Sequence, residues 1–146
     1  MNVEIGHGSF HRRIAINVGA GYVPGINAVI TGAAMAAGKM GWEMVGIRDG
    51  FEGVLHPERY PDGGLVSLSP QLIENLDPCD GGILGQSARV DPFHVRHVNE
   101  DDMVEEFDMS GELLKKLKTE NIGALISVVG GQGLSILYKL HRKGLN

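Results

Sequence analysis

The sequence is poor in the residue types that mark several whole classes of protein. It contains one cysteine, Cys79, among 146 residues, which excludes a disulfide scaffold and a zinc site built from thiolates. Aromatic residues make up only 5%, so we expect an aliphatic core. No apolar run approaches the ~18 residues of a membrane span, and the N-terminal residues lack the apolar stretch of ~7–15 residues that a signal peptide needs. We therefore expect a protein of the reducing cytoplasm that does not bind membranes.

Positive charge is also scarce. Thirteen lysines and arginines stand against 18 aspartates and glutamates, for a formal net charge of −5 and an isoelectric point near 5.6. This balance argues against nonspecific binding to nucleic acid or to an anionic membrane. Hydrophobic residues at 42% exclude wholesale disorder. The residue in excess is glycine, with 22 copies, about twice the usual ~7%.

Hydrophobic patterning predicts an α/β fold with a layered, mostly parallel sheet. Residues 13–64 form a first βαβ unit, with strand patterns at 13–18 and 43–48. Between them lie a glycine-rich turn and a helical pattern that begins at Ile26 and ends at Gly41, a suitable left-handed cap.

Two more segments follow, a less regular middle segment over 65–109 and a regular one over 110–146. In the middle segment we expect a short helix over Pro70–Leu76 capped by Ser69, a short buried strand over 81–85 and a solvated connection over 90–108. In the last segment we expect a helix that is capped by Ser110 and runs to Glu120, a strand over 124–129, and a final helix that ends near Gly144.

The two densest glycine clusters each lie after a predicted strand and before a predicted helix. In an open parallel sheet, such turns meet at the carboxyl ends of the strands, where ligands bind. Bare backbone N–H groups and the helix dipole favour an anion there. The clusters predict a phosphate site, although glycine also serves tight turns and close packing. A dinucleotide site is an alternative. Gly19, Gly21 and Gly25 form a G-x-G-x-x-x-G pattern that is one residue longer than the usual fingerprint, and Asp49 would face a ribose.

Four segments, in order, resemble motifs of the 6-phosphofructokinases and together span nearly the whole chain. They are Pro24–Ile30 (PGINAVI), Gly46–Val54 (GIRDGFEGV), Gly81–Arg89 (GGILGQSAR) and Gly130–Gly133 (GGQG). The resemblance implies a phosphofructokinase-like fold and phosphorylation of fructose 6-phosphate with ATP or pyrophosphate and Mg²⁺. It also implies a phosphorylated small molecule as the ligand.

The resemblance places cofactor-binding residues at six positions. Gly21 would approach the donor phosphates, Arg89 would pair with them through its planar fork, and Gly131–Gly133 would form a second phosphate turn. Two positions depart from the family, because Tyr22 and Gln132 stand where it carries acids. An amide is a weak ligand for Mg²⁺, which prefers carboxylates and phosphate oxygens. The sequence therefore assigns no metal ligand.

The catalytic aspartate of the family lies in a P-x-T-I-D/E-N-D segment beyond the position of Asn146, so no catalytic residue is identified here. A domain that stops before its next central strand leaves an open sheet edge. We expect the fold to be incomplete without a second polypeptide, in a hetero- or homo-oligomer.

Two other functions remain open. Self-cleavage after Asn146 would give the partner chain an N-terminal Thr, Ser or Cys nucleophile, with the glycine turns as oxyanion donors for acyl transfer or amide hydrolysis. Alternatively, the chain is a non-catalytic protein that binds a metabolite and regulates a partner. A weaker pattern, His94 and His97 near Asp101 and Asp102, is compatible with a metal site but more typical of a half-buried loop or strand.

Overall fold

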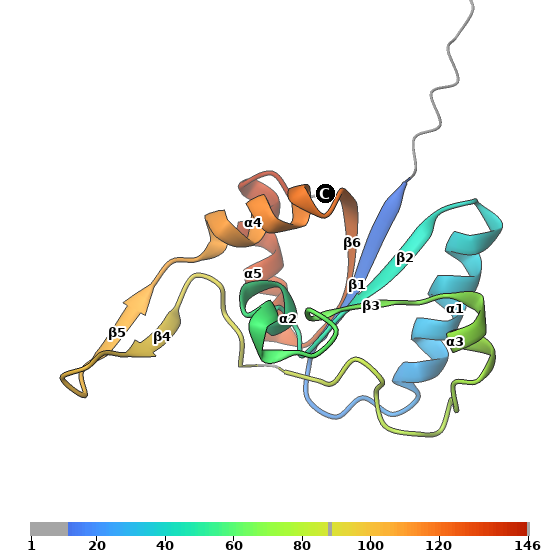
Figure 1. Ribbon diagram of the computed structural model, residues 1–146, viewed down its shortest axis with the longest axis horizontal. Helices are drawn as coiled ribbons and strands as arrows, with labels where there is room; N and C mark the ends of the chain where they lie inside the picture. The colour runs from blue at the N-terminus through green and yellow to red at the C-terminus, as the bar shows by residue number, and fades with distance from the viewer. Residues whose placement is uncertain (1–11, 88, 146) are drawn as a thin grey trace, which may run out of the picture.

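The structure, a computed structural model, describes residues 12–87 and 89–145. Ala88, within the third motif, and Asn146 lie outside the described residues. Four strands form one sheet in the order β3 (Leu65–Ser67), β2 (Glu43–Ile47), β1 (Arg13–Gly19) and β6 (Ile122–Val129) (Figure 1). β1 pairs in parallel with β2 and β6, whereas β3 is antiparallel to β2. The prediction of a layered α/β fold with a mostly parallel sheet is confirmed.

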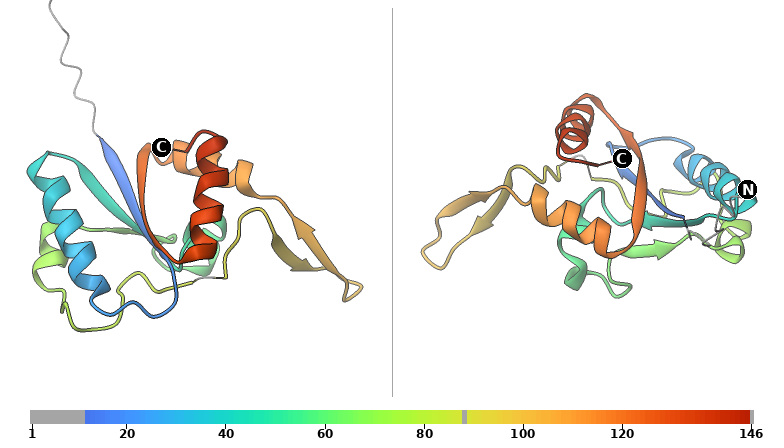
Figure 2. Two further views of the ribbon diagram at one scale, coloured as in Figure 1. Left: turned by 180° about the vertical axis from the view of Figure 1, so that it is seen from behind. Right: turned by 90° about the horizontal axis from the view of Figure 1, so that it is seen from above.

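Helices cover both faces of this sheet (Figures 1 and 2). The first face carries α1 (Ile26–Lys39) and α3 (Pro70–Glu74), and the second carries α2 (Glu52–Leu55), the 3₁₀ turn η1 (Pro57–Arg59), α4 (Ser110–Thr119) and α5 (Gly131–Arg142). Alternate residues of β1 serve the two faces, because Ile14, Ile16 and Val18 join the α1 core and Ala15 joins the α4 and α5 core. None of the described helices is long and apolar enough to cross a bilayer.

Two predicted helix ends are confirmed and one is wrong. Gly41 follows α1 with a left-handed φ of 70°, and the Ser69 hydroxyl accepts a bond from the Leu72 N–H at the start of α3. Ser110 does not cap α4. It is buried as the first helical residue, and its N–H donates to Asp108 instead. The Asp108 carboxylate, two residues before Ser110, is thus the acceptor at the N-terminal end of α4.

The buried strand predicted over 81–85 is wrong. Leu84 is fully buried, but the segment bends, with a bond from the Gly85 N–H to the Gly82 carbonyl and a left-handed φ of 71° at Gly85. An ideal Cβ at Gly85 would lie against the Asp49 carboxylate. The apolar run is therefore a partly buried loop, whose backbone bonds with side chains and turns instead of forming a strand.

Most of the connection predicted over 90–108 is exposed, as expected, although Pro92 is buried, and it contains regular structure. β4 (Val95–Val98) and β5 (Val104–Phe107) pair as an antiparallel hairpin. The Asn99 side chain closes the turn by accepting bonds from the N–H groups of Asp101 and Met103. Charged residues interrupt both strands, so the alternation that marks a strand is obscured. The hairpin projects from the body of the molecule in every view (Figures 1 and 2).

Candidate active site

A crevice opens at the carboxyl ends of β1 and β6, which are neighbours in the sheet. The chain leaves β1 towards α1 on one face and leaves β6 towards α5 on the other (Figure 1). This divergence is a topological switch point, where ligands of open α/β sheets bind. Both glycine clusters lie at this edge, as the sequence predicted.

A buried polar group ties the strands together below the crevice. Asn17 in β1 has no exposed surface, and its amide donates to the Gly50 carbonyl at 3.2 Å. Its oxygen accepts a bond from the Ser127 hydroxyl on β6. These contacts satisfy a polar side chain in an apolar environment and link β1, β6 and the turn after β2. The sequence signal for this contact is an asparagine within an apolar strand.

Two adjoining clefts occupy this edge. The larger, of about 790 Å³, lies between α2, the segment before β4, and α5. The smaller, of about 520 Å³, lies beside the turn after β1 and includes Gly21, Asp49 and Tyr60. Arg89 lines both clefts, so one guanidinium serves both spaces.

Two cations that line the larger cleft, Arg89 and Lys139, have no acidic partner among residues 12–87 and 89–145. Arg59 is hydrogen-bonded to Glu52, and His94 lies 2.6 Å from Glu106. By contrast, neither Arg89 nor Lys139 forms an ion pair with a described carboxylate. Lys139 lies over the ring of Phe93, 5.3 Å from its centroid. The cleft can therefore accept an anion without breaking an ion pair.

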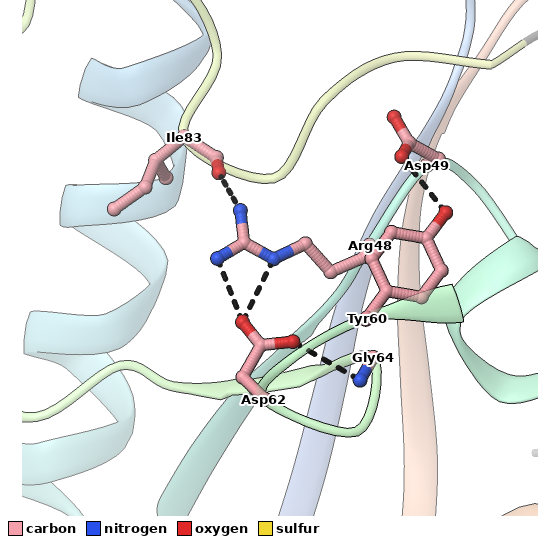
Figure 3. A network of polar contacts seen from close by, with 6 residues as sticks. All are labelled: Arg48, Asp49, Tyr60, Asp62, Gly64 and Ile83. Atoms are coloured by element: carbon pink, nitrogen blue, oxygen red, sulfur yellow. Dashed lines mark hydrogen bonds and ion pairs between the residues drawn. The ribbon is translucent and has the colours of Figure 1, made fainter. Parts of the chain in front are cut away.

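The loop after β2 supports the smaller cleft through two side-chain contacts (Figure 3). The Arg48 guanidinium donates to Asp62 at 2.7 and 3.0 Å and to the Ile83 carbonyl at 2.7 Å. These bonds hold the pKa of Asp62 below its ordinary value. The Tyr60 hydroxyl donates to Asp49 at 2.8 Å. Burial first, and this carboxylate second, raise the pKa of Tyr60 to about 12.

Asn27 holds the segment that leads to Arg89. This residue lies in the first turn of α1 with 1% of its surface exposed. Its amide donates to the carbonyls of Asp77 at 2.9 Å and Gly81 at 3.0 Å, and its oxygen accepts from the Ile83 N–H at 2.9 Å. Asn27 belongs to the first recognised motif, but no local pattern indicates partners that lie 50 to 56 residues away.

The predicted site residues occupy different positions around the crevice. Arg89 lines both clefts, Gln132 lines the larger one and Gly21 lines the smaller one. Tyr22 is 84% exposed and, like Gly131, lines neither cleft. Gly133 packs under β6, where an ideal Cβ would lie 2.5 Å from Cβ of Val129. Its position indicates helix–strand packing.

The residues present do not form a ready site for Mg²⁺. Within residues 12–87 and 89–145, no three side chains of the metal-binding types are grouped closely enough to share an ion. His94 is bonded to Glu106, and Asp49, the proposed ribose partner of the dinucleotide alternative, is bonded to Tyr60. Mg²⁺ is usually held by one or two carboxylates with substrate phosphates. The amide of Gln132 does not replace such a carboxylate.

Comparison with known proteins agrees with this geometry. The family model described as Phosphofructokinase matches residues 13–146. The chain is 33% identical over 134 residues to the ATP-dependent 6-phosphofructokinase of Chloroflexus aggregans, and 34% identical over 133 residues to the pyrophosphate–fructose 6-phosphate 1-phosphotransferase of Dictyoglomus thermophilum. Each comparison covers 91% of this chain but only 35% and 33% of the relatives. The chain thus spans about a third of their length.

A solved structure supports the fold. The phosphofructokinase from Saccharomyces cerevisiae superposes with a TM-score of 0.57 at 19% identity, covering 80% of this chain and 13% of that chain. The resemblance inferred from four motifs is confirmed by the family match over residues 13–146. This chain belongs to the phosphofructokinase family.

Proposed function

We propose that this chain forms the phosphate-donor side of a phosphotransferase that acts on fructose 6-phosphate, with ATP or pyrophosphate as the donor. One observation carries the proposal. Arg89, which has no acidic partner among the described residues, lines both clefts at the carboxyl edge of the sheet. A guanidinium placed in this way binds phosphate oxygens through two parallel hydrogen bonds.

The backbone around Arg89 supports the same ligand. An ideal Cβ at Gly21 would meet no atom within 4 Å, so a phosphate can approach the turn after β1. Helix α5 begins at Gly131 with no side-chain cap, and its second residue, Gln132, lines the larger cleft. Uncapped N–H groups and the helix dipole favour an anion at this end.

The larger cleft favours a nucleotide over bare pyrophosphate. Its volume of about 790 Å³ lies within the ~300–1,000 Å³ of small-molecule sites. Beside its charged residues it includes the apolar side chains of Leu55, Val90, Val95 and Ile136. Pyrophosphate has no apolar surface to place against them. In this proposal a nucleoside occupies the larger cleft and its phosphates reach Arg89.

We further propose that another polypeptide completes the fold and supplies the general base. Relatives of this chain are about three times as long, and β6 pairs with β1 alone among the described strands. Ile126 in β6 is 40% exposed, although apolar strand residues are usually covered. A strand added at β6 would cover this edge and bring further residues to the crevice.

Calorimetric titration of ATP and of pyrophosphate, each with Mg²⁺, tests donor binding. Loss of a charged hydrogen bond costs about 1.5–3 kcal/mol, so Arg89→Ala should weaken binding by roughly 10–100-fold. Lys39→Ala, at the far end of α1, removes the same charge elsewhere and should leave affinity unchanged. The proposal fails if neither donor binds saturably to the wild-type chain, or if Arg89→Ala binds both donors as the wild type does.

Turnover separates an enzyme from a binding protein. The chain together with its completing polypeptide should convert fructose 6-phosphate to the bisphosphate in the presence of the donor that binds. Saturable donor binding without any phosphorylated product would instead support the non-catalytic alternative, a protein that binds a metabolite and regulates a partner.

A further inference from the structure

The larger cleft is positively charged, although the chain as a whole is acidic. With the histidines taken as neutral, its lining carries a net charge of +2, whereas the formal net charge of the chain is −5. The charged residues of the lining are Arg59, Arg89, Arg96, Lys139, Glu52 and Asp91. A charged cleft concentrates the electrostatic potential and raises the local concentration of ions of the opposite sign. The cleft therefore favours anions, and favours them more strongly as their charge rises.

The carboxylates that line the two clefts are already engaged within the described part of the chain. Asp49 and Glu52 each accept a side-chain hydrogen bond, and Asp91 accepts the N–H of Phe93 at 2.9 Å. A Mg²⁺ ion would have to compete with these bonds for its oxygen ligands, and it would do so beside an excess of cations. The residues of the clefts therefore disfavour a divalent cation and favour a bare polyanion.

One face of α5 lines the larger cleft. Gln132, Ser135, Ile136 and Lys139 all border it, and intervals of three, four and seven residues place them on one side of the helix. Lys139 lies two turns, about 10 Å, from Gln132 along the helix axis. Its ammonium group is 5.3 Å from the centre of the Phe93 ring, a contact that leaves N–H groups to bind an anion. α5 therefore presents an uncapped N-terminus and a lysine to the same cleft.

Arg89 and Lys139 reach this cleft from different elements of the fold. Neither forms an ion pair with a carboxylate of residues 12–87 and 89–145, whereas the other two arginines of the lining each have an acidic partner. Unpaired cations gain most from a phosphate, because charge-assisted hydrogen bonds form without the loss of an existing ion pair. A ligand that contacts both residues must carry several negative charges along its length, as a polyphosphate does.

We propose, building on the donor binding proposed above, that the two clefts bind the phosphate donor preferentially as its metal-free polyanion, and that Lys139 is one of the residues that bind it. Arg89 and Lys139 neutralise phosphate charge that a bound Mg²⁺ would otherwise neutralise. Mg²⁺ removes two negative charges from a nucleoside triphosphate, so the metal-bound form is attracted less strongly to the cleft. The Gln132 amide, a weak ligand for Mg²⁺, donates an N–H to a phosphate oxygen instead.

Calorimetric titration of ATP in two buffers tests this preference. One buffer contains EDTA and the other contains Mg²⁺ in excess over ATP. Both have the same pH, and KCl brings them to the same ionic strength, because salt screens the attraction between charges. The wild-type chain should bind ATP at least about tenfold more tightly in EDTA than in Mg²⁺.

Four variants test the residues involved. Lys139→Met removes the charge but keeps an apolar stem, and it should weaken ATP binding in EDTA by about tenfold or more and in Mg²⁺ by less. Lys39→Met, which lies outside both clefts, is the matched control and should change neither affinity. Gln132→Asp adds a carboxylate and should shift the preference towards Mg²⁺, whereas Gln132→Asn should not. Each comparison uses one protein in two buffers, so a partly unfolded sample cannot imitate a changed preference.

The outcomes separate this inference from the proposed function. Equal affinity of the wild-type chain in the two buffers, or tighter binding with Mg²⁺, overturns the metal-free preference and leaves the proposed donor site intact. Unchanged affinity of Lys139→Met in EDTA overturns the assignment of that residue. If ATP binds saturably in neither buffer, the donor site itself is refuted, and the preference is refuted with it.

Discussion

Substitution of Gly133 by alanine distinguishes a packing glycine from a phosphate-binding one. The residue is the third of α5, and an ideal Cβ there would lie 2.5 Å from Cβ and 2.8 Å from Cγ1 of Val129. Val129 is β-branched and belongs to β6, so its side chain cannot rotate away freely. Relief of the clash requires α5 to move from the sheet.

The expected cost follows from two opposing contributions. Overpacking a core contact destabilises a protein by about 1–3 kcal/mol, whereas alanine in place of glycine within a helix contributes about 0.5–1 kcal/mol of stability. Gly133→Ala should therefore lower the free energy of unfolding by up to about 2.5 kcal/mol, with about 1 kcal/mol at the middle of the two ranges. Gly131→Ala is the matched control, because an ideal Cβ there meets no atom within 4 Å, and it should be at least as stable as the wild type, since it gains helix preference without a clash.

Urea unfolding followed by circular dichroism measures the difference, and pyrophosphate titration of the same samples gives the affinity. A Gly133→Ala chain as stable as Gly131→Ala would refute the packing interpretation. Unchanged stability together with weakened pyrophosphate binding would instead support the phosphate turn that the sequence predicted.

Three further results are expected. Asn27→Ala removes three partly buried hydrogen bonds and should cost about 3 kcal/mol by urea unfolding, at ~1 kcal/mol per bond, whereas Asn75→Ala, which removes an exposed bond, should cost far less. The raised pKa of Tyr60, about 12 against an ordinary 10, contributes stability below pH 10 that is lost as the pH rises towards 12. Tyr60→Phe should abolish this loss in alkaline unfolding curves. The pKa of Asp108 is lowered to about 2, first by the Ser110 hydroxyl bond, so its contribution to stability should disappear as the pH falls from ~4 to 2, and Asp108→Asn should flatten that part of the acid unfolding profile.

The sequence predicted those elements whose apolar residues follow one clear period. The strands at 13–18 and 124–129 and the helix from Ile26 were located correctly because each buries a regular face. The hairpin was missed because Arg96 and the glutamates of β5 interrupt its alternation. β3 has three residues, too few to establish a period.

The predicted site was incomplete for a different reason. Motif resemblance identified Arg89 and Gln132, which line the larger cleft. It did not identify Arg48 or Asn27 as supports, because their partners lie 35 and 56 residues away. Contacts of this kind depend on the assembled fold and leave no periodic pattern in the sequence.

The partly buried loop before Arg89 has a thermodynamic consequence for ligand binding. Much of its hydrogen bonding is to the side chains of Asn27 and Arg48, with single backbone bonds to Asp49 and to Val18 of β1, so it can open locally without disrupting the pairing of the sheet strands. Opening would displace Arg89 from both clefts. A donor that binds only the closed loop must stabilise the closed loop. By linkage, the free energy of this stabilisation equals the free energy that loop closure contributes to the affinity for the donor. The affinity for the donor and the stability of the closed loop therefore depend on one equilibrium, and the hydrogen bonds of Asn27 help to set it.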